Sequence, residues 1–248
     1  MTLVMAWLNK TNAATALHIA SESRFSGGSD HWDYGPKIFR LFPTRDYLAY
    51  CGDVRLALSL ILQGTAVLAN TNTLRVSAGQ KPIATIARVR ALCTLFDVPV
   101  KAFPSAWRGP TTLLYCGFDQ LRKQFQLFKL SLTKQNQLNP IKVDLYKERV
   151  ACFGSGQPNA QKALATGMKT GEIFGVLVSV IADKSVPSVG GVPQMVTIKK
   201  STSHPVGFNW DTDGTLKNTL FGLPLHFRSN MKRVEFRDKQ FRLKPYLG

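Results

Sequence analysis

The order of the expected strands and helices predicts an α+β fold. Strand-like segments come first, two helical segments follow, and strands and helices then occur again in separate runs. Elements that segregate into runs, instead of alternating singly, favour α+β over a parallel α/β sheet. The chain has 248 residues, of which 44% are hydrophobic and 19% charged, and this composition is typical of a globular protein with a substantial core.

The first half of the chain begins with a predicted hairpin. Segments 2–8 and 15–20 are apolar and strand-like, and a polar turn at 9–12 separates them. A polar, Gly-rich loop at 23–34 follows. The other elements expected before residue 150 are strands at 37–42, 47–51, 111–118, 125–131 and 141–146, and helices at 54–68 and 82–95.

The second half contains fewer clear elements. Strands are expected at 150–154 and 194–199, and helices at 160–166 and 172–182. Beyond residue 200, short strands and loops follow without a clear period. The expected organisation is therefore a core at 1–200 with a basic C-terminal extension at 201–248 packed on it.

The chain is strongly basic, with 32 Lys and Arg against 15 Asp and Glu and a net charge of +17. Such an excess favours anionic partners, including nucleic acid. However, there is no block of consecutive basic residues, and no helix-turn-helix, zinc or RNA-binding motif is visible. A solvated basic surface explains the charge equally well, so association with nucleic acid ranks last among the functions considered.

The cysteines predict buried, reduced thiols and a cytoplasmic location. They form no CxxC pair and no metal-like spacing with the histidines, so neither a metal nor a cofactor is expected. The cysteines are Cys51, Cys93, Cys116 and Cys152.

No segment is expected to enter a membrane. The apolar run at 3–8 is too short for a signal peptide, and the apolar stretch at 56–69 is interrupted by polar residues.

Thr2 is the first candidate for chemistry, because removal of Met1 would expose its α-amino group. An N-terminal threonine can attack an acyl carbon with its hydroxyl, and its own amine can take the proton. This chemistry also needs a nearby cation that lowers the pKa of the amine, and a donor for the oxyanion. A strand that begins at the terminus would hold that amine in a fixed position.

Four further residues fit these needs. Lys37 opens a predicted strand in GPKIFRLF, and Glu22 closes another in HIASESR. Gly52 lies at a strand-to-helix turn, where a backbone N–H can approach a substrate closely. Ser155 lies in CFGSGQPNAQKAL and could bond the terminal amine. Each also has an ordinary reading: a solvated lysine, a surface carboxylate, a turn glycine and a capping serine.

In this order, the stretches resemble proteasome β-subunits and the bacterial HslV peptidase. The matching stretches are TLVMAWL, HIASESR, GPKIFRLF, YLAYCGDVRLALSLI and CFGSGQPNAQKAL, and the resemblance covers about 2–200. It implies a four-layer αββα sandwich of two antiparallel sheets flanked by helices, the N-terminal-nucleophile hydrolase type.

The resemblance also implies roles for individual residues. Thr2 would be the nucleophile, Lys37 the cation that lowers the pKa of the amine, and Glu22 its carboxylate partner. The Gly52 amide would donate to the oxyanion, and Ser155 would bond the amine.

Two departures from the family are visible. The family usually has Asp where Glu22 stands. The family's second Asp and Ser precede Gly-Gly, and the corresponding stretch here is ADKSVPSVGG. Asp183 is the candidate for that Asp, and Ser185 and Ser188 lie near it.

The sequence therefore predicts a threonine-type peptidase or amidase that cleaves amide bonds without a cofactor. Its substrate would be a peptide or another amide, and the resemblance implies a homo-oligomer. The alternative is a catalytically inactive scaffold or binding subunit of the same family.

Overall fold

The computed structural model describes residues 2–10, 15–27, 30–42, 44–70, 81–133, 136–166, 172–212, 214–225 and 234–246. The chain forms two compact units. The first comprises Met1–Ile38, Val150–Thr197 and Ser203–Gly248, and the second comprises Phe39–Arg149 and Ile198–Thr202.

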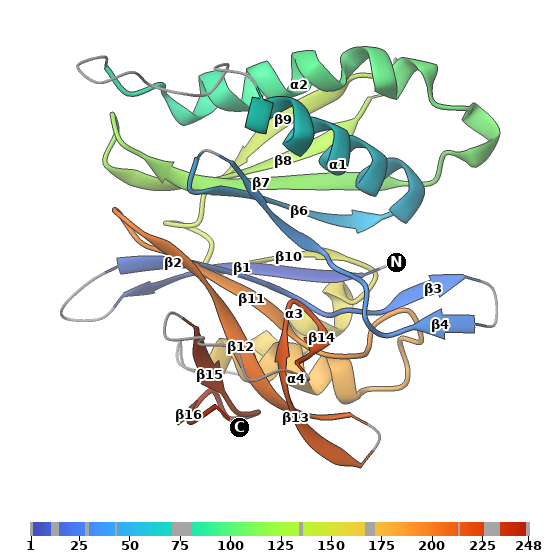
Figure 1. The fold of residues 1–248 in the computed structure, drawn as a ribbon, viewed down its shortest axis with the longest axis vertical. Coiled ribbons are helices and arrows are strands. Elements are labelled where there is room, and N and C mark those ends of the chain that lie inside the picture. Colours follow the sequence, from blue (N-terminus) through green and yellow to red (C-terminus); the bar gives the residue numbers. More distant parts are fainter. Residues whose placement is uncertain are drawn as a thin grey trace. The chain divides into compact units, whose positions relative to one another are not determined.

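The first unit is built on a nine-stranded sheet (Figure 1). Its main path runs β10-β1-β2-β11-β12-β13-β14, while β15 pairs with β12 and with β16. The strands are β1 (Leu3–Lys10), β2 (Thr15–Ser21), β10 (Val150–Gly154), β11 (Gln194–Ile198), β12 (Ser203–Thr212), β13 (Thr215–Leu220), β14 (Leu223–Pro224), β15 (Glu235–Arg237) and β16 (Leu243–Lys244). A separate hairpin joins β3 (Phe25–Gly27) to β4 (Asp30–Trp32).

Strand β1 lies inside this sheet, with antiparallel partners on both sides. Leu3 lies opposite Gly154 of β10, and Val4 lies opposite Ser21 of β2. Six consecutive residues from Leu3 are buried. An uninterrupted apolar run suits a strand that is covered on both faces, and it holds the start of the chain in the sheet.

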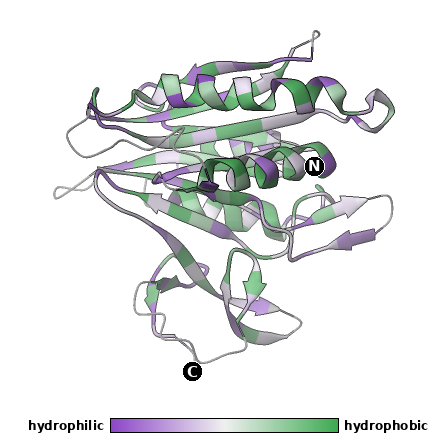
Figure 2. Ribbon diagram, turned by 45° about the horizontal axis from the view of Figure 1, so that its top comes forward, coloured by the Kyte–Doolittle hydropathy of each residue, from purple (hydrophilic) through white to green (hydrophobic). Residues whose placement is uncertain are grey.

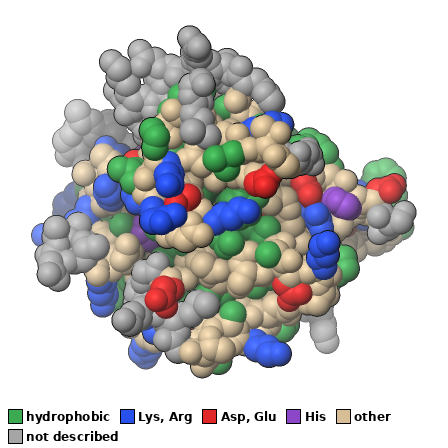
Figure 3. Space-filling view, turned by 90° about the horizontal axis from the view of Figure 1, so that it is seen from below, with side chains coloured by type: hydrophobic (Ala, Val, Ile, Leu, Met, Phe, Trp, Pro, Cys, Tyr) green, Lys and Arg blue, Asp and Glu red, His purple; other side chains and the backbone are tan. Residues whose placement is uncertain are grey.

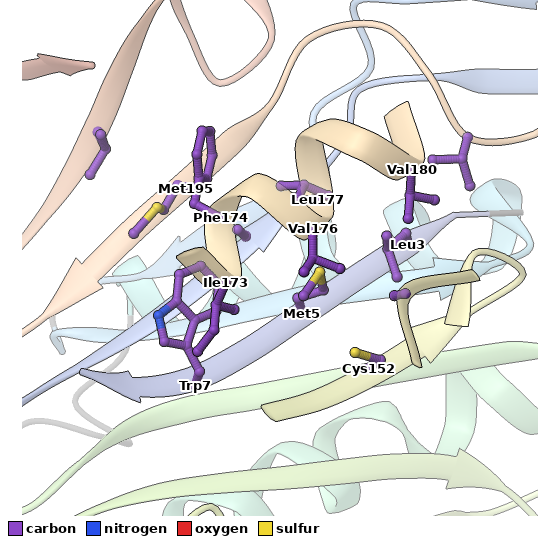
Figure 4. Packing of buried hydrophobic residues seen from close by; sticks show 14 of the residues in the cluster. Leu3, Met5, Trp7, Cys152, Ile173, Phe174, Val176, Leu177, Val180 and Met195 are labelled. Carbon is purple, nitrogen blue, oxygen red and sulfur yellow. The ribbon is translucent and has the colours of Figure 1, made fainter. Parts of the chain in front are cut away.

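Two helices, α3 (Gln157–Ala165) and α4 (Ile173–Ala182), build the hydrophobic core of the first unit with the sheet. Figure 4 shows α4 packing over β1, with Val176 close to Met5 and Phe174 close to Met195. The Phe174 ring stacks on Phe208 of β12, with centroids 4.9 Å apart. Because α4 is apolar along its whole length, it can be covered on more than one side.

The second unit contains a five-stranded antiparallel sheet in the order β5-β6-β7-β8-β9. Helices α1 and α2 contact each other and this sheet. The buried residues of α1 recur at helical spacing, and both helices carry hydrophobic and hydrophilic residues (Figure 2). The elements are β5 (Ile38–Leu41), β6 (Asp46–Gly52), α1 (Val54–Asn70), α2 (Thr85–Ala102), the 3₁₀ turn η1 (Ser105–Trp107), β7 (Thr111–Asp119), β8 (Gln124–Leu132) and β9 (Leu138–Val143).

The predicted α+β, four-layer αββα sandwich is wrong. The chain is mostly β, with 42% strand and 27% helix, and its antiparallel sheets include a curled half-barrel instead of two sheets flanked by helices. The physical reason lies beyond residue 200. Strands β12 to β16 extend the first sheet there, whereas the sequence pattern predicted an irregular extension.

Several element boundaries also differ from the predictions. Helix α2 continues to Ala102 with Pro99 inside it, although the expected helix ended at 95. The Gly-rich loop expected at 23–34 contains β3 and β4. The turn expected at 9–12 lies partly outside the described residues, and β1 continues through Lys10.

The expected boundary at residue 200 does not coincide with the two compact units, and the core-and-extension organisation stays a prediction. In the part of the chain that the structure describes, no helix is long and apolar enough to cross a membrane.

Candidate functional site

Thr2 is buried at the start of β1, with 1% of its surface exposed. Its backbone carbonyl lies 3.5 Å from two donors, the Gly156 N–H and the Ser155 hydroxyl. The next carbonyl, of Leu3, accepts a 2.8 Å bond from Ser21 Oγ. Neighbouring strands and the turn before α3 therefore fix the backbone of Thr2.

The Lys37 ammonium is the centre of the site, and Lys37 is 1% exposed. Its Nζ donates to Thr2 Oγ1, to Glu22 Oε1 at 2.9 Å and to the Arg24 carbonyl at 2.6 Å. An ammonium group has three donors and no acceptor. These three bonds can therefore use all of its donors, and the threonine hydroxyl is one of their targets.

The Glu22 carboxylate, which is fully buried, completes a buried ion pair with Lys37. Its Oε2 accepts the Arg24 N–H at 2.6 Å and the Gly190 N–H at 3.4 Å. Burial raises the pKa of Glu22, while the Lys37 charge and these hydrogen bonds oppose the rise. Burying two charges is costly unless both are well bonded, and here both are.

Gln194 holds the backbone on which Lys37 lies, and the sequence reasoning missed it. Its Oε1 accepts the Lys37 N–H at 2.9 Å, and its Nε2 donates to the Gly35 carbonyl at 2.6 Å. Gln194 is fully buried at the start of β11. The only sequence signal was a polar residue opening an apolar strand, and that signal is weak.

Ser155 lies beside Ser188, with the two Oγ atoms 2.9 Å apart. The turn that carries Ser155 can approach β1 because the next residue is Gly156. A Cβ on that residue would lie 2.9 Å from the Leu3 Cβ. The sequence placed Ser188 near Asp183 without assigning it a role. In the structure, its hydroxyl bonds Ser155 near the Thr2 carbonyl.

Asp183 is engaged elsewhere. Its Oδ2 accepts bonds of 2.8 Å from Asn159 Nδ2 and from Ser185 Oγ, and its Oδ1 accepts the Ser185 N–H at 2.8 Å. Hydrogen bonds from Ser185, first from its backbone N–H, lower the pKa of Asp183. The described bonds tie the end of α4 to α3, and none of them reaches Thr2.

Gly52 belongs to the second unit and ends β6. Its φ is +106°, and a Cβ would lie 1.9 Å from the Pro110 carbonyl oxygen, so the turn requires glycine. The following Asp53 accepts the Arg55 N–H at 2.8 Å, as an N-cap does. The role of the Gly52 amide as an oxyanion donor stays a prediction.

An aromatic hairpin, formed by β3 and β4, begins next to the site. The Phe25 ring lies 5.3 Å from Lys37 Nζ and 5.5 Å from the Trp32 ring. Arg24 and Asp33 form a two-bond ion pair at 2.6 and 2.8 Å across the base of the hairpin. Trp32 is 51% exposed, so the ring series leads from the buried ammonium to solvent.

The cysteines are free thiols, three of them buried and Cys93 partly buried. Burial raises the pKa of Cys93 to about 11 and that of Cys152 to about 12, so these thiols are poor nucleophiles at neutral pH. Among the described residues, no group of three or more His, Cys, Asp and Glu side chains could hold a metal ion.

Comparisons with known proteins give no family. No protein-family model matches the chain, and no curated protein matches its sequence.

Proposed function

We propose that this chain is an N-terminal threonine hydrolase that cleaves amide bonds, with Thr2 as the nucleophile after removal of Met1. The observation that carries the proposal is the buried Lys37 ammonium, which donates to Thr2 Oγ1 while Glu22 balances its charge. A buried ion pair adds little net stability, so a lysine buried against the Thr2 hydroxyl favours a role in chemistry. The resemblance to proteasome β-subunits and HslV supports the same assignment on Thr2, Lys37 and Glu22.

Lys37 acts as a hydrogen-bond donor and positive charge in this mechanism. With its donors directed at three oxygens, the ammonium has no lone pair with which to take the hydroxyl proton. The base is therefore the free α-amine of Thr2, whose pKa the adjacent cation lowers. The hydroxyl oxygen then attacks the amide carbon, the C–N bond breaks, and the proton passes from the amine to the leaving nitrogen. Water then attacks the resulting Thr2 ester, which releases the carboxylic acid and restores the hydroxyl.

The Ser155–Ser188 pair supports the amine in this proposal. The two hydroxyls are bonded to each other beside the Thr2 carbonyl, and either can turn a lone pair toward a neighbouring donor. The Gly52 amide is proposed as a donor to the oxyanion on the strength of the resemblance alone. The homo-oligomer is likewise proposed from the resemblance, and the cytoplasmic location is proposed from the free cysteines.

An inactive scaffold or binding subunit is the second candidate. It is favoured by Asp183, whose described bonds go to Asn159 and Ser185 and not to the Thr2 region. A nucleic-acid-binding protein remains the weakest candidate. On the face seen in Figure 3, acidic side chains lie among the Lys and Arg side chains, and no uniform basic stripe crosses the described part of that face.

The proposal is tested by mass spectrometry in two steps. The intact mass of the native protein shows whether Met1 is absent. A β-lactone probe then reports the nucleophile: Thr2 Oγ1 attacks the lactone carbonyl, the ring C–O bond breaks, and the released alkoxide takes the proton. The adduct is an ester that carries the whole mass of the probe, and peptide mapping should place it on Thr2.

Two variants serve as controls. Thr2→Ser should keep labelling, whereas Thr2→Ala should lose it while the protein stays folded by circular dichroism. Retention of Met1 in the native protein contradicts the proposal. Labelling that persists in Thr2→Ala also contradicts it, and an unlabelled native protein without Met1 favours the scaffold.

A further inference from the structure

A second site candidate is a cavity of about 560 Å³ in the C-terminal part of the first unit. It lies between the β12–β13 hairpin and the loop that joins β15 to β16, and we call it the C-terminal cavity. Its volume falls within the range of about 300–1,000 Å³ that small-molecule pockets occupy. None of the residues proposed to act on an amide bond lines it.

The β12–β13 side of the cavity carries buried polar side chains. Asn209 and Asn218 lie opposite each other in the hairpin, and both are buried. Asn209 Nδ2 donates to Asn218 Oδ1 at 2.7 Å. The Asn209 Oδ1 has no hydrogen-bond partner among the described residues, so this wall has one acceptor to spare.

The loop side of the cavity is fixed by Asp238. Its carboxylate accepts the Gln240 N–H at 3.0 Å, the Arg242 N–H at 2.9 Å and the Arg242 Nε at 2.8 Å. Lys244 Nζ lies 3.5 Å from the same carboxylate. The negative charge of Asp238 is therefore already balanced by Arg242 and Lys244 within the loop.

Two opposite charges at the cavity remain without an ion-pair partner in the described part of the chain. Lys239 Nζ lies 5.1 Å from the centre of the Trp210 ring, but no carboxylate pairs with it. Asp211 lines the same cavity, and no Lys or Arg pairs with it. The two are not within ion-pair distance of each other, which leaves one cation and one anion to receive a ligand.

We propose that the C-terminal cavity binds a small zwitterion, a free amino acid or short peptide with an apolar side chain. The ligand carboxylate pairs with Lys239, and its ammonium group pairs with Asp211. Leu216 and Pro245 supply apolar surface for the side chain. The three kinds of surface match the three parts of an amino acid.

Isothermal titration calorimetry tests this proposal with three related ligands. L-Leucine carries both charges, leucinamide lacks the carboxylate, and N-acetyl-leucine lacks the ammonium. Leucine should give saturable heat, and each derivative should bind about tenfold more weakly. Methionine and phenylalanine extend the test to other apolar side chains.

Single-charge variants then locate the site. Lys239→Met should weaken leucine about tenfold and bring leucine and leucinamide to similar affinity. Asp211→Asn should do the same for leucine and N-acetyl-leucine. Lys101→Met and Asp97→Asn remove the same charges from an exposed pair on α2 and should leave the affinity unchanged.

Three outcomes overturn the proposal. One is the absence of saturable heat with all three apolar amino acids up to about 20 mM, well above the range of useful affinities. The second is equal binding of leucine and both derivatives to the native protein. The third is unchanged affinity in both cavity variants. Thr2→Ala should bind leucine normally, so a failure of the proposed hydrolase activity leaves this test intact.

Discussion

Each unit of the molecule contains a buried ionic cluster, and the two clusters differ in where their bonds lead. In the second unit, Arg88 bonds Asp46 at 2.8 Å and Tyr115 at 3.1 Å, and it also donates to the Ile83 carbonyl at 2.8 Å. In the first unit, Lys37 bonds Glu22, a backbone carbonyl and the hydroxyl of Thr2.

The hydrogen bonds of the Arg88 cluster all join residues of the second unit, and we call it the closed cluster. Tyr115 also donates to Asp46, and the guanidinium reaches the Thr85 hydroxyl at 3.1 Å. These bonds join α2 to β6 and β7, and all of them end on fixed parts of the same unit. Such a cluster stabilises the unit. The Lys37 cluster differs, because one of its bonds ends on the hydroxyl of Thr2, the proposed nucleophile.

The largest effect is expected from breaking the closed cluster. Arg88→Met leaves Asp46 buried without its cation and should lower the free energy of unfolding by about 3–5 kcal/mol. Urea denaturation measures this loss. Lys101→Met in the exposed Lys101–Asp97 pair is the control and should cost about 0.5 kcal/mol or less. Equal losses in the two variants would contradict the structural role of the Arg88 cluster.

Breaking the Lys37 cluster should affect chemistry more than stability. Lys37→Met should slow β-lactone labelling of Thr2 by about 10²–10³-fold, because the charge beside the nucleophile is lost. Its cost in stability should be smaller than that of Arg88→Met, since Glu22 can take up a proton. Lys37→Arg keeps the charge but changes the donor geometry, and it should restore stability without restoring labelling. A labelling rate within threefold of the native rate in Lys37→Met would remove Lys37 from the mechanism.

The pH dependence of Thr2 labelling should report the protonation of Glu22 in the Lys37 cluster. Burial raises the pKa of Glu22 above its ordinary value of 4.5 in the folded state. Labelling should therefore fall as the pH falls through this raised pKa. A raised carboxyl pKa favours folding below the unfolded pKa and loses that contribution as pH rises, so this group should not drive acid unfolding. Labelling rates measured from pH 4 to 8 on the folded protein define the acid limb of the pH–rate profile. On this limb, the rate should fall about tenfold for each pH unit.

Glu22→Gln is the matched variant for the pH experiment. It keeps a carbonyl oxygen for Lys37 but cannot titrate, so the acid limb should flatten and the rate at neutral pH should drop. An unchanged limb in Glu22→Gln would assign the titration to another group.

A smaller effect is expected at the serine pair. Ser188→Ala removes the partner of Ser155 and should slow labelling about fivefold, the equivalent of one hydrogen bond of about 1 kcal/mol. Ser185→Ala is the control, because Ser185 is bonded to Asp183 and is exposed. If Ser185→Ala slows labelling more than Ser188→Ala does, the assignment of the two serines is reversed.

The smallest effect concerns the aromatic hairpin beside Lys37. Trp32→Ala should weaken the affinity of an apolar β-lactone about threefold without changing its maximal labelling rate, since an exposed ring adds about 0.5–1 kcal/mol. Trp107→Ala is the matched control, because Trp107 is 58% exposed and belongs to the second unit. Equal effects of the two variants would exclude a specific contact with the hairpin.

The sequence predicted the local elements of the candidate site better than its long-range contacts. The apolar segments that form β1 and β2, and the positions of Glu22 and Lys37 at strand ends, follow from short patterns within the first 40 residues. Ser188 and Gln194 did not, because their partners Ser155 and Lys37 lie 33 and 157 positions away. Asp183 was proposed from the family pattern, but its described hydrogen bonds come from Asn159 and Ser185.

The fold class was missed because short strands carry little pattern. Strands β14, β15 and β16 have two or three residues each, too few for an alternating period to be visible. Strand β14 pairs with β13, β15 pairs with β12, and β16 pairs with β15. These pairings depend on tertiary contacts that a short pattern does not reveal. Similarly, the helix expected at 82–95 continues to Ala102 with Pro99 inside it, because tertiary context can override local propensity.

The positions of the site residues along the chain determine the order in which they are synthesised. Thr2, Glu22 and Lys37 leave the ribosome together, whereas Ser155, Ser188 and Gln194 follow much later. At about 5–20 residues per second, roughly 6–24 s separate the synthesis of Lys37 from that of Ser155. During this interval β1 lacks β10 and the Thr2 carbonyl lacks its donors. The nucleophile would therefore be completed only after most of the chain has been made, so a nascent chain carries an unassembled site.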